Sequence, residues 1–203
     1  MGQLERLNAQ IQADPMNHAF TEAGIAPLYA VYPRAKILII GQAPGKAAQD
    51  SRLFWNDKSG DRLRQWLGVS REFFYHSEQV AILPMDFYYP GKGASGDLPP
   101  RAGFAAKWHS ALLQAMPDIA LTLLVGSYAV HAYLGVAKSA KLTDLVQHYE
   151  QYLPTYWPLI HPSPRNQIWM KQHPWFEADV VPALQARVAS VLGQTNPPVT
   201  QGR

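Results

Sequence analysis

The segment Lys36-Ile37-Leu38-Ile39-Ile40-Gly41-Gln42-Ala43-Pro44-Gly45 decides the fold. Four consecutive branched aliphatic residues, 37 to 40, are typical of a strand buried on both faces of a parallel sheet. The glycines of the following loop allow backbone N–H groups to approach a ligand closely. Because ligands of open α/β sheets bind beyond the carboxyl ends of the strands, this loop is a candidate site. A glycine-containing exit is also ordinary for any parallel strand, so one loop alone does not decide between the two interpretations.

A second stretch near the C-terminus has the same organisation. Residues 155–160 form a short apolar segment that predicts a strand, and they lead directly into His161-Pro162-Ser163-Pro164-Arg165-Asn166. Two further strands are predicted at 79–84 and 119–126. Since the carboxyl ends of parallel strands lie at one edge of the sheet, the two polar loops are expected to face each other across one crevice.

Apolar residues at helical spacing occupy the segments between the predicted strands. A surface helix is expected to carry Leu4, Leu7 and Ile11 and to end before Pro15. A second helix begins at 59–61 and is closed by Gly68, and a third is capped by Ser70 and runs to Tyr75. The remaining helices are expected over 104–116, after the caps Ser127 and Thr143, and over 175–192, where Pro182 lies in the first turn or at a kink. Residues 85–103 show no regular pattern, and a loop of that length is uncommon unless it is functional.

Strands that alternate with helices predict an α/β fold, a three-layer α/β/α arrangement with a mostly parallel four-stranded central sheet. The 203 residues, of which 47% are hydrophobic and 16% charged, are enough for one sizeable core. We therefore expect residues 1–203 to form a single domain, with a helical extension over 1–30 and a flexible tail over 193–203.

Composition excludes several classes of chemistry. The chain has no cysteine, which rules out disulfides, thiolate zinc sites, cysteine-ligated iron–sulfur clusters and a cysteine nucleophile. The histidines show no paired metal-ligand spacing, so no metal and no cofactor are expected. A net charge of +3 permits a nucleic-acid partner without requiring one. No apolar leader or membrane span is evident, and we expect a cytoplasmic monomer with no membrane partner.

Together, the two loops resemble the signature motifs of the uracil-DNA glycosylase superfamily. Residues 41–45 are similar to the Gly-Glu-Ala-Pro-Gly motif of its iron–sulfur branch, and residues 161–166 match the His-Pro-Ser-Pro-Arg-Asn motif of its single-strand-selective monofunctional branch. Asp50 and Phe54 follow the first loop as an acidic residue and a phenylalanine do in that superfamily, and residues 124–127 resemble its third strand before a helix. The likeness covers roughly residues 36 to 190. The missing cysteines mean that the resemblance to the iron–sulfur branch is one of loop sequence and not of cofactor.

This resemblance implies a uracil-DNA glycosylase-like fold and a monofunctional DNA base-excision repair enzyme. Such an enzyme flips uracil or another deaminated or damaged base out of DNA and hydrolyses its N-glycosidic bond, which requires stabilisation of the departing base anion. By resemblance, His161 donates a hydrogen bond to that anion, the backbone around Gly41, Gln42 and Ala43 binds the base, and Phe54 stacks on it. The simpler alternatives are a buried histidine that is satisfied by a carbonyl and a phenylalanine of the core.

The second loop is implied to hold the DNA. Arg165 would enter the duplex where the base has left, and Ser163 and Asn166 would grip the flanking phosphates. The alternative for Arg165 is an ordinary solvated surface arginine.

Two departures from the superfamily pattern affect the chemistry. Ala43 stands where other branches have an aspartate or asparagine that positions water, which leaves Gln42 and Asp50 as candidates. The strand at 79–84 is not followed by the asparagine that usually reads uracil, and Asp86 is the nearest polar substitute. Because an ionised aspartate accepts hydrogen bonds and donates none, Asp86 predicts an altered base choice, toward bases that present an amino group.

These departures keep two other functions open. The chain could be a catalytically weak relative that acts as a binding module for modified or abasic nucleic acid. It could also bind a small phosphate or nucleotide on the same sheet, in which case its affinity for DNA would depend little on salt.

Overall fold

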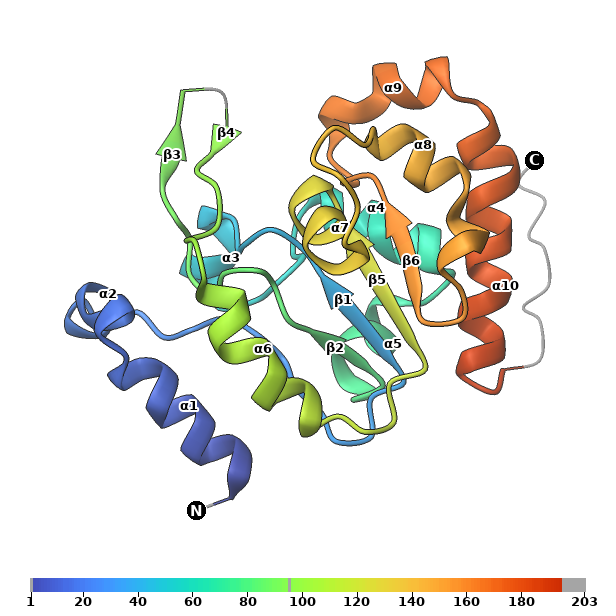
Figure 1. Ribbon diagram of the computed structural model, residues 1–203. Helices are drawn as coiled ribbons and strands as arrows, with labels where there is room; N and C mark the ends of the chain where they lie inside the picture. The colour runs from blue at the N-terminus through green and yellow to red at the C-terminus, as the bar shows by residue number, and fades with distance from the viewer. Residues whose placement is uncertain (1, 95, 195–203) are drawn as a thin grey trace.

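The computed structural model describes residues 2–94 and 96–194. Its centre is a parallel sheet in the order β2 (Val80–Ile82), β1 (Ile37–Ile40), β5 (Leu121–Val125) and β6 (Tyr156–Leu159) (Figure 1). Every residue of β1 and β5 is buried, as expected for inner strands with both faces covered. The four predicted strands and the parallel sheet are therefore confirmed.

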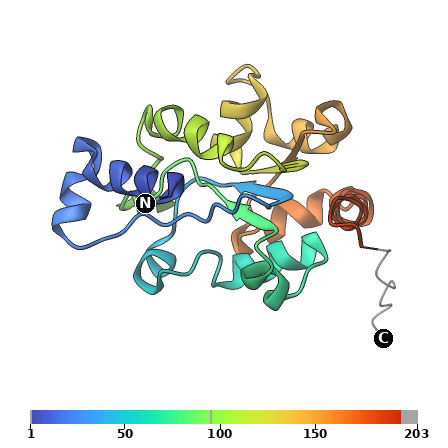
Figure 2. The same ribbon diagram turned by 90° about the horizontal axis from the view of Figure 1, so that it is seen from below.

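Helices cover both faces of the sheet (Figure 2). Successive residues of β1 point to opposite faces: Ile37 and Ile39 join one core, and Leu38 and Ile40 join the other. The first core is completed by α4 (Lys58–Leu67), α5 (Arg71–His76) and α10 (Val181–Val191). The second is completed by α1 (Gln3–Ala13), α6 (Phe104–Gln114) and α7 (Ser127–Leu134), while α8 (Leu142–Gln147) contributes to both. This arrangement confirms the three-layer α/β/α fold.

Two of the predicted helix caps are confirmed and two are wrong. Gly68 ends α4 in a left-handed conformation with φ of 68°, and the Ser70 hydroxyl accepts a hydrogen bond from the N–H of Phe73. Ser127 lies inside α7, because the chain turns at Gly126 directly after β5 and the helix begins one residue earlier than expected. Thr143 lies inside α8, where its hydroxyl accepts from the indole N–H of Trp169.

Several short elements were not predicted because their few residues show little periodicity. They are α2 (His18–Glu22), α3 (Lys46–Ser51), α9 (Gln167–Gln172), the hairpin of β3 (Lys92–Gly93) and β4 (Gly96–Asp97), and the 3₁₀ turns Pro15–Asn17, Tyr149–Tyr152 and Pro164–Asn166. A π-helical turn over Phe176–Val180 leads into α10, which has Pro182 in its first turn as expected. Most of the predicted tail, 195–203, lies outside the described residues.

The segment before β1 is joined to the body of the protein. Helix α1 packs on α6, and Ala30 forms an antiparallel bridge with Ile82 of the edge strand β2. Among the described residues, no helix has the length and hydrophobicity needed to cross a membrane.

Candidate active site

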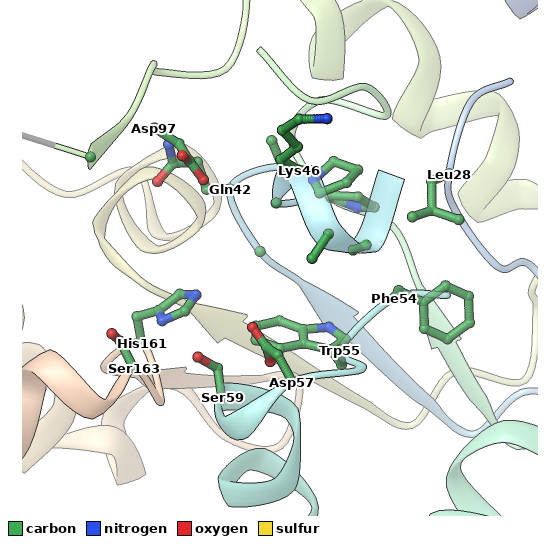
Figure 3. A pocket seen from close by; sticks show the side chains of 18 of the residues that line it. Leu28, Gln42, Lys46, Phe54, Trp55, Asp57, Ser59, Asp97, His161 and Ser163 are labelled. Atoms are coloured by element: carbon green, nitrogen blue, oxygen red, sulfur yellow. The ribbon is translucent and has the colours of Figure 1, made fainter. Parts of the chain in front are cut away.

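A cavity of about 760 Å³ opens at the carboxyl ends of the strands (Figure 3). Residues 41–48, which follow β1, line it together with His161, Ser163 and Arg165, which follow β6. The intervening strand β5 does not separate the two loops, because it ends in Gly126: a Cβ at this glycine would lie 4.0 Å from the Cβ of His161. The two loops therefore meet at one cavity, as the sequence predicted.

The imidazole of His161 points into this cavity (Figure 3). Its own carbonyl accepts a 2.7 Å hydrogen bond from the Asn166 side chain, which braces the turn, and its ring has no hydrogen-bond partner among the described residues. Burial lowers the pKa of His161 below its usual value, while the carboxylates of Asp57 and Asp97 act in the opposite direction. Burial thus favours the neutral imidazole, which has an N–H that it can donate.

His109 is a core histidine whose ring is fully hydrogen-bonded, and it serves as a comparison for His161. The residue is 4% exposed, and its ring nitrogens lie within hydrogen-bond distance of the Tyr133 hydroxyl and the Pro84 carbonyl. Burial lowers the pKa of His109 to about 4. The ring of His161 has no such partners, which distinguishes the two histidines.

In the first loop, backbone carbonyls form hydrogen bonds within the protein, whereas two backbone N–H groups do not. The carbonyls of Gly41 and Gln42 accept hydrogen bonds from the N–H groups of Met85 and Asp86, at 2.8 and 3.1 Å. Within the described part of the chain, no acceptor pairs with the N–H groups of Gln42 and Ala43. These amides are thus available to a ligand. The side chain of Gln42 is engaged, since its amide donates to the carbonyl of Leu98 at 2.8 Å.

Two adjacent aromatic residues line the cavity and point in different directions (Figure 3). Phe54 packs near Tyr75, with ring centroids 5.9 Å apart. Trp55 lies beside His161, with centroids 5.5 Å apart and planes tilted by 34°. The sequence had singled out Phe54 and missed Trp55, because nothing in the local pattern shows which of two neighbouring aromatic residues faces a site formed by distant loops.

Two cavity-lining carboxylates were also missed as site residues. Asp57 is the N-cap of α4, where one oxygen accepts from the N–H of Gly60 at 2.8 Å. Asp97 lies on β4, and one of its carboxylate oxygens is 3.5 Å from the Tyr89 hydroxyl, a long contact. The charges of both carboxylates act to raise the pKa of His161.

Asp50 and Asp86, which the sequence placed in the site, do not line the cavity. Asp50 is turned to solvent on α3, where it forms an i,i+4 ion pair with Lys46 at 2.7 Å. Asp86 is fully buried, and its oxygens accept from the N–H of Tyr88 and from the backbone, Nε and Nη2 of Arg101, at 2.7–3.1 Å. Its carboxylate therefore holds the 85–103 segment and lies outside the cavity that a base would enter.

The second loop is divided between two hollows. Ser163 and Arg165 line the cavity of about 760 Å³, and Arg165 is exposed at its rim. Asn166 faces a neighbouring hollow of about 390 Å³, which Gln42 and His161 also line, and its amide nitrogen is used by the His161 carbonyl. Asn166 thus braces the loop in this structure, and its expected contact with a phosphate stays a prediction.

No group of three or more His, Asp or Glu side chains among the described residues has the arrangement of a metal site. In a comparison with protein families, the model of the uracil DNA glycosylase superfamily matches residues 29–185. The match spans the whole sheet and both loops of the cavity.

Proposed function

Because this chain belongs to the uracil-DNA glycosylase superfamily, whose members act on DNA, we propose that it is a monofunctional DNA N-glycosylase for uracil or another deaminated or damaged base. The free imidazole of His161, which faces a cavity lined by unpaired backbone amides, is the observation that carries this proposal.

The chemistry follows from where charge develops. When the N-glycosidic bond breaks, its electron pair stays with the base, which becomes an anion, and the sugar becomes cationic at C1′. A neutral His161 donates a hydrogen bond to the base oxygen, and the N–H groups of Gln42 and Ala43 supply further fixed dipoles. In a cavity from which DNA excludes water, such donors lower the barrier strongly.

The sugar cation must then be captured by water, whose oxygen bonds to C1′ as a proton leaves. Ala43 has no side chain that orients water, whereas Asp57 and Asp97 present carboxylates to the same cavity. One oxygen of Asp57 is already used as a helix cap, so Asp97 has the greater free acceptor capacity. We therefore assign the orientation of water, and acceptance of its proton, to Asp97.

The DNA strand is proposed to run along the rim of the cavity. Lys46, Lys92 and Arg165 line this rim and provide positive charge for phosphates, and Arg165 is the exposed side chain that would fill the gap left by the flipped base.

The test uses oligonucleotides that contain uracil, hypoxanthine, xanthine or 5-hydroxymethyluracil. After incubation with the protein and then with alkali, we expect strand breaks at one or more of these bases with wild type. His161→Ala should lower the rate about 100-fold or more, whereas His148→Ala, at an exposed histidine on the end of α8, should not. Wild type that breaks none of the four, or an unimpaired His161→Ala variant, would contradict the proposal.

A binding module for modified or abasic nucleic acid is the second candidate. It is favoured by Ala43 and by the lack of an asparagine after β2. In the same experiment it predicts salt-dependent binding to the modified oligonucleotides with no breaks in any of them.

A further inference from the structure

The cavity extends across the sheet from one edge strand to the other. His161 follows β6, whereas Ile82 and Pro84 lie at the end of β2 and directly after it, and the sheet order places β1 and β5 between them. Three strand spacings separate the two edges, which corresponds to about 14 Å. Leu28 lies at the end of the cavity away from His161 (Figure 3). We call Leu28, Ile82 and Pro84 the β2 end of the cavity.

The side chains of the β2 end are apolar and closed off from solvent. Leu28 is 8% exposed and Ile82 is 2% exposed, and Pro84 is also buried. None of these side chains has a hydrogen-bond donor or acceptor. Several polar side chains of the cavity lie on the His161 side in Figure 3, namely Gln42, Asp57, Ser59, Asp97 and Ser163.

The backbone of the β2 end is used within the protein. The N–H and the carbonyl of Ile82 both form 2.8 Å hydrogen bonds with one residue of the segment before β1. The N–H of Leu28 donates to the carbonyl of Phe87 at 2.8 Å. Pro84 has no N–H, and its carbonyl lies 2.9 Å from Nε2 of His109. These backbone groups are therefore not available to a ligand.

A base enters the cavity with its glycosidic bond toward the DNA, so its pairing edge goes in first. In uracil this edge carries O4 and N3–H, and in cytosine it carries the N4 amino group and N3. Burial of such a group without a partner weakens binding about 5- to 150-fold. The β2 end therefore discriminates against both of these bases.

We propose that the preferred substrate is a pyrimidine whose pairing edge is covered by an exocyclic hydrocarbon bridge, such as 3,N4-ethenocytosine. The bridge joins N3 to N4 through C–H groups, which meet the apolar side chains of the β2 end at no cost in lost hydrogen bonds. The O2 atom remains free to accept a hydrogen bond from His161. This inference rests on the proposed glycosylase function and names the class of base that the enzyme removes.

The cleavage of this base balances as it does for uracil. The C1′–N1 bond breaks and its electron pair stays with the base, where the negative charge is shared with O2. Water adds to C1′ and gives up a proton. The products are an abasic site and the free, protonated base.

The test compares single-stranded oligonucleotides of one sequence that contain either uracil or 3,N4-ethenocytosine at the same position. Single strands are used so that the stability of a base pair does not affect the result. From strand breaks after alkali, we expect wild type to excise the etheno base about 10-fold faster than uracil or more, because uracil buries unpaired groups. Affinities are measured with His161→Ala, whose slow cleavage leaves both bases in place, and should show the same preference.

Pro84→Asn should shift the preference toward uracil, because its amide offers a donor to O4 and an acceptor to N3–H. We expect the ratio of the two excision rates to change about 10-fold or more. Leu28→Asn should shift it in the same direction from a separate segment, and it guards against misfolding of the first variant. Pro117→Asn is the matched control, since Pro117 is exposed and does not line the cavity.

The inference is overturned if wild type excises uracil at least as fast as the etheno base, or if both asparagine variants leave the ratio unchanged. Excision of neither base would contradict the glycosylase proposal, and the affinities of His161→Ala would then decide the inference separately. Tighter binding of the etheno oligonucleotide would support the apolar β2 end, and equal binding would overturn it.

Discussion

Replacement of Asp86 with asparagine should destabilise the fold and leave base preference unchanged. The carboxylate accepts four hydrogen bonds, three of them from Arg101, and it is completely buried. Asparagine has the same shape but only one acceptor oxygen, so its NH₂ group would face donors. Disruption of a buried ion pair costs about 3–5 kcal/mol. Because 24% of the Arg101 side chain is exposed, we expect the lower value, about 3 kcal/mol, and a Tm lower by about 10 °C.

The assay is urea unfolding followed by far-ultraviolet circular dichroism, combined with excision rates on the four modified oligonucleotides. Asp50→Asn is the matched control, since the exposed Lys46–Asp50 pair should contribute less than about 1 kcal/mol. A stable Asp86→Asn variant whose preferred base has changed would refute the reasoning and return Asp86 to the role that the sequence suggested for it.

Three further predictions concern other parts of the protein. Since burial lowers the pKa of His109 from 6.5 to about 4, the unfolded chain takes up its proton first as the pH falls. The free energy of unfolding should therefore drop by about 2 kcal/mol from about pH 7.5 to about pH 5, and an unfolding series on His109→Gln should show a flatter dependence. Gly60→Ala should cost about 2 kcal/mol or more, because its methyl group would overlap the Trp55 carbonyl; a variant of unchanged urea midpoint would contradict this packing. Arg165→Ala should slow excision from duplex DNA about tenfold more than from single strands, because a filled gap matters only in a stack; equal losses in the two rate measurements would exclude that role.

The sequence predicted the sheet and the meeting of the two loops because both depend on local patterns. Residues 37–40 form an uninterrupted aliphatic run, and such runs report burial on both faces regardless of what surrounds them. Once the strands are parallel, their exits share an edge. Because His161 directly follows one of these strands, its place at this edge of the sheet could be predicted without knowing which side chains surround it.

The roles of Asp86 and Trp55 could not be predicted in the same way. Asp86 was proposed to read the base because it is the polar residue nearest to the place where the superfamily usually has an asparagine. Its partner Arg101 lies 15 residues further along a segment without regular pattern. Trp55 owes its direction to Arg64, Tyr75 and the absence of a side chain at Gly60. Each of these cases depends on which distant groups share a buried space, and periodicity contains no such information.

The guanidinium of Arg101 also reaches backward along the chain. It donates to the carbonyl of Met16 and lies over the ring of Phe20, 5.1 Å from its centroid, while Phe20 stacks on Tyr88. The stretch that carries the hairpin, one wall of the cavity, is thus fastened to residues that precede the range matched by the superfamily model. A recombinant fragment trimmed to residues 29–185 would lose these attachments, so the position of the hairpin at the mouth of the cavity would change with the leading helices removed.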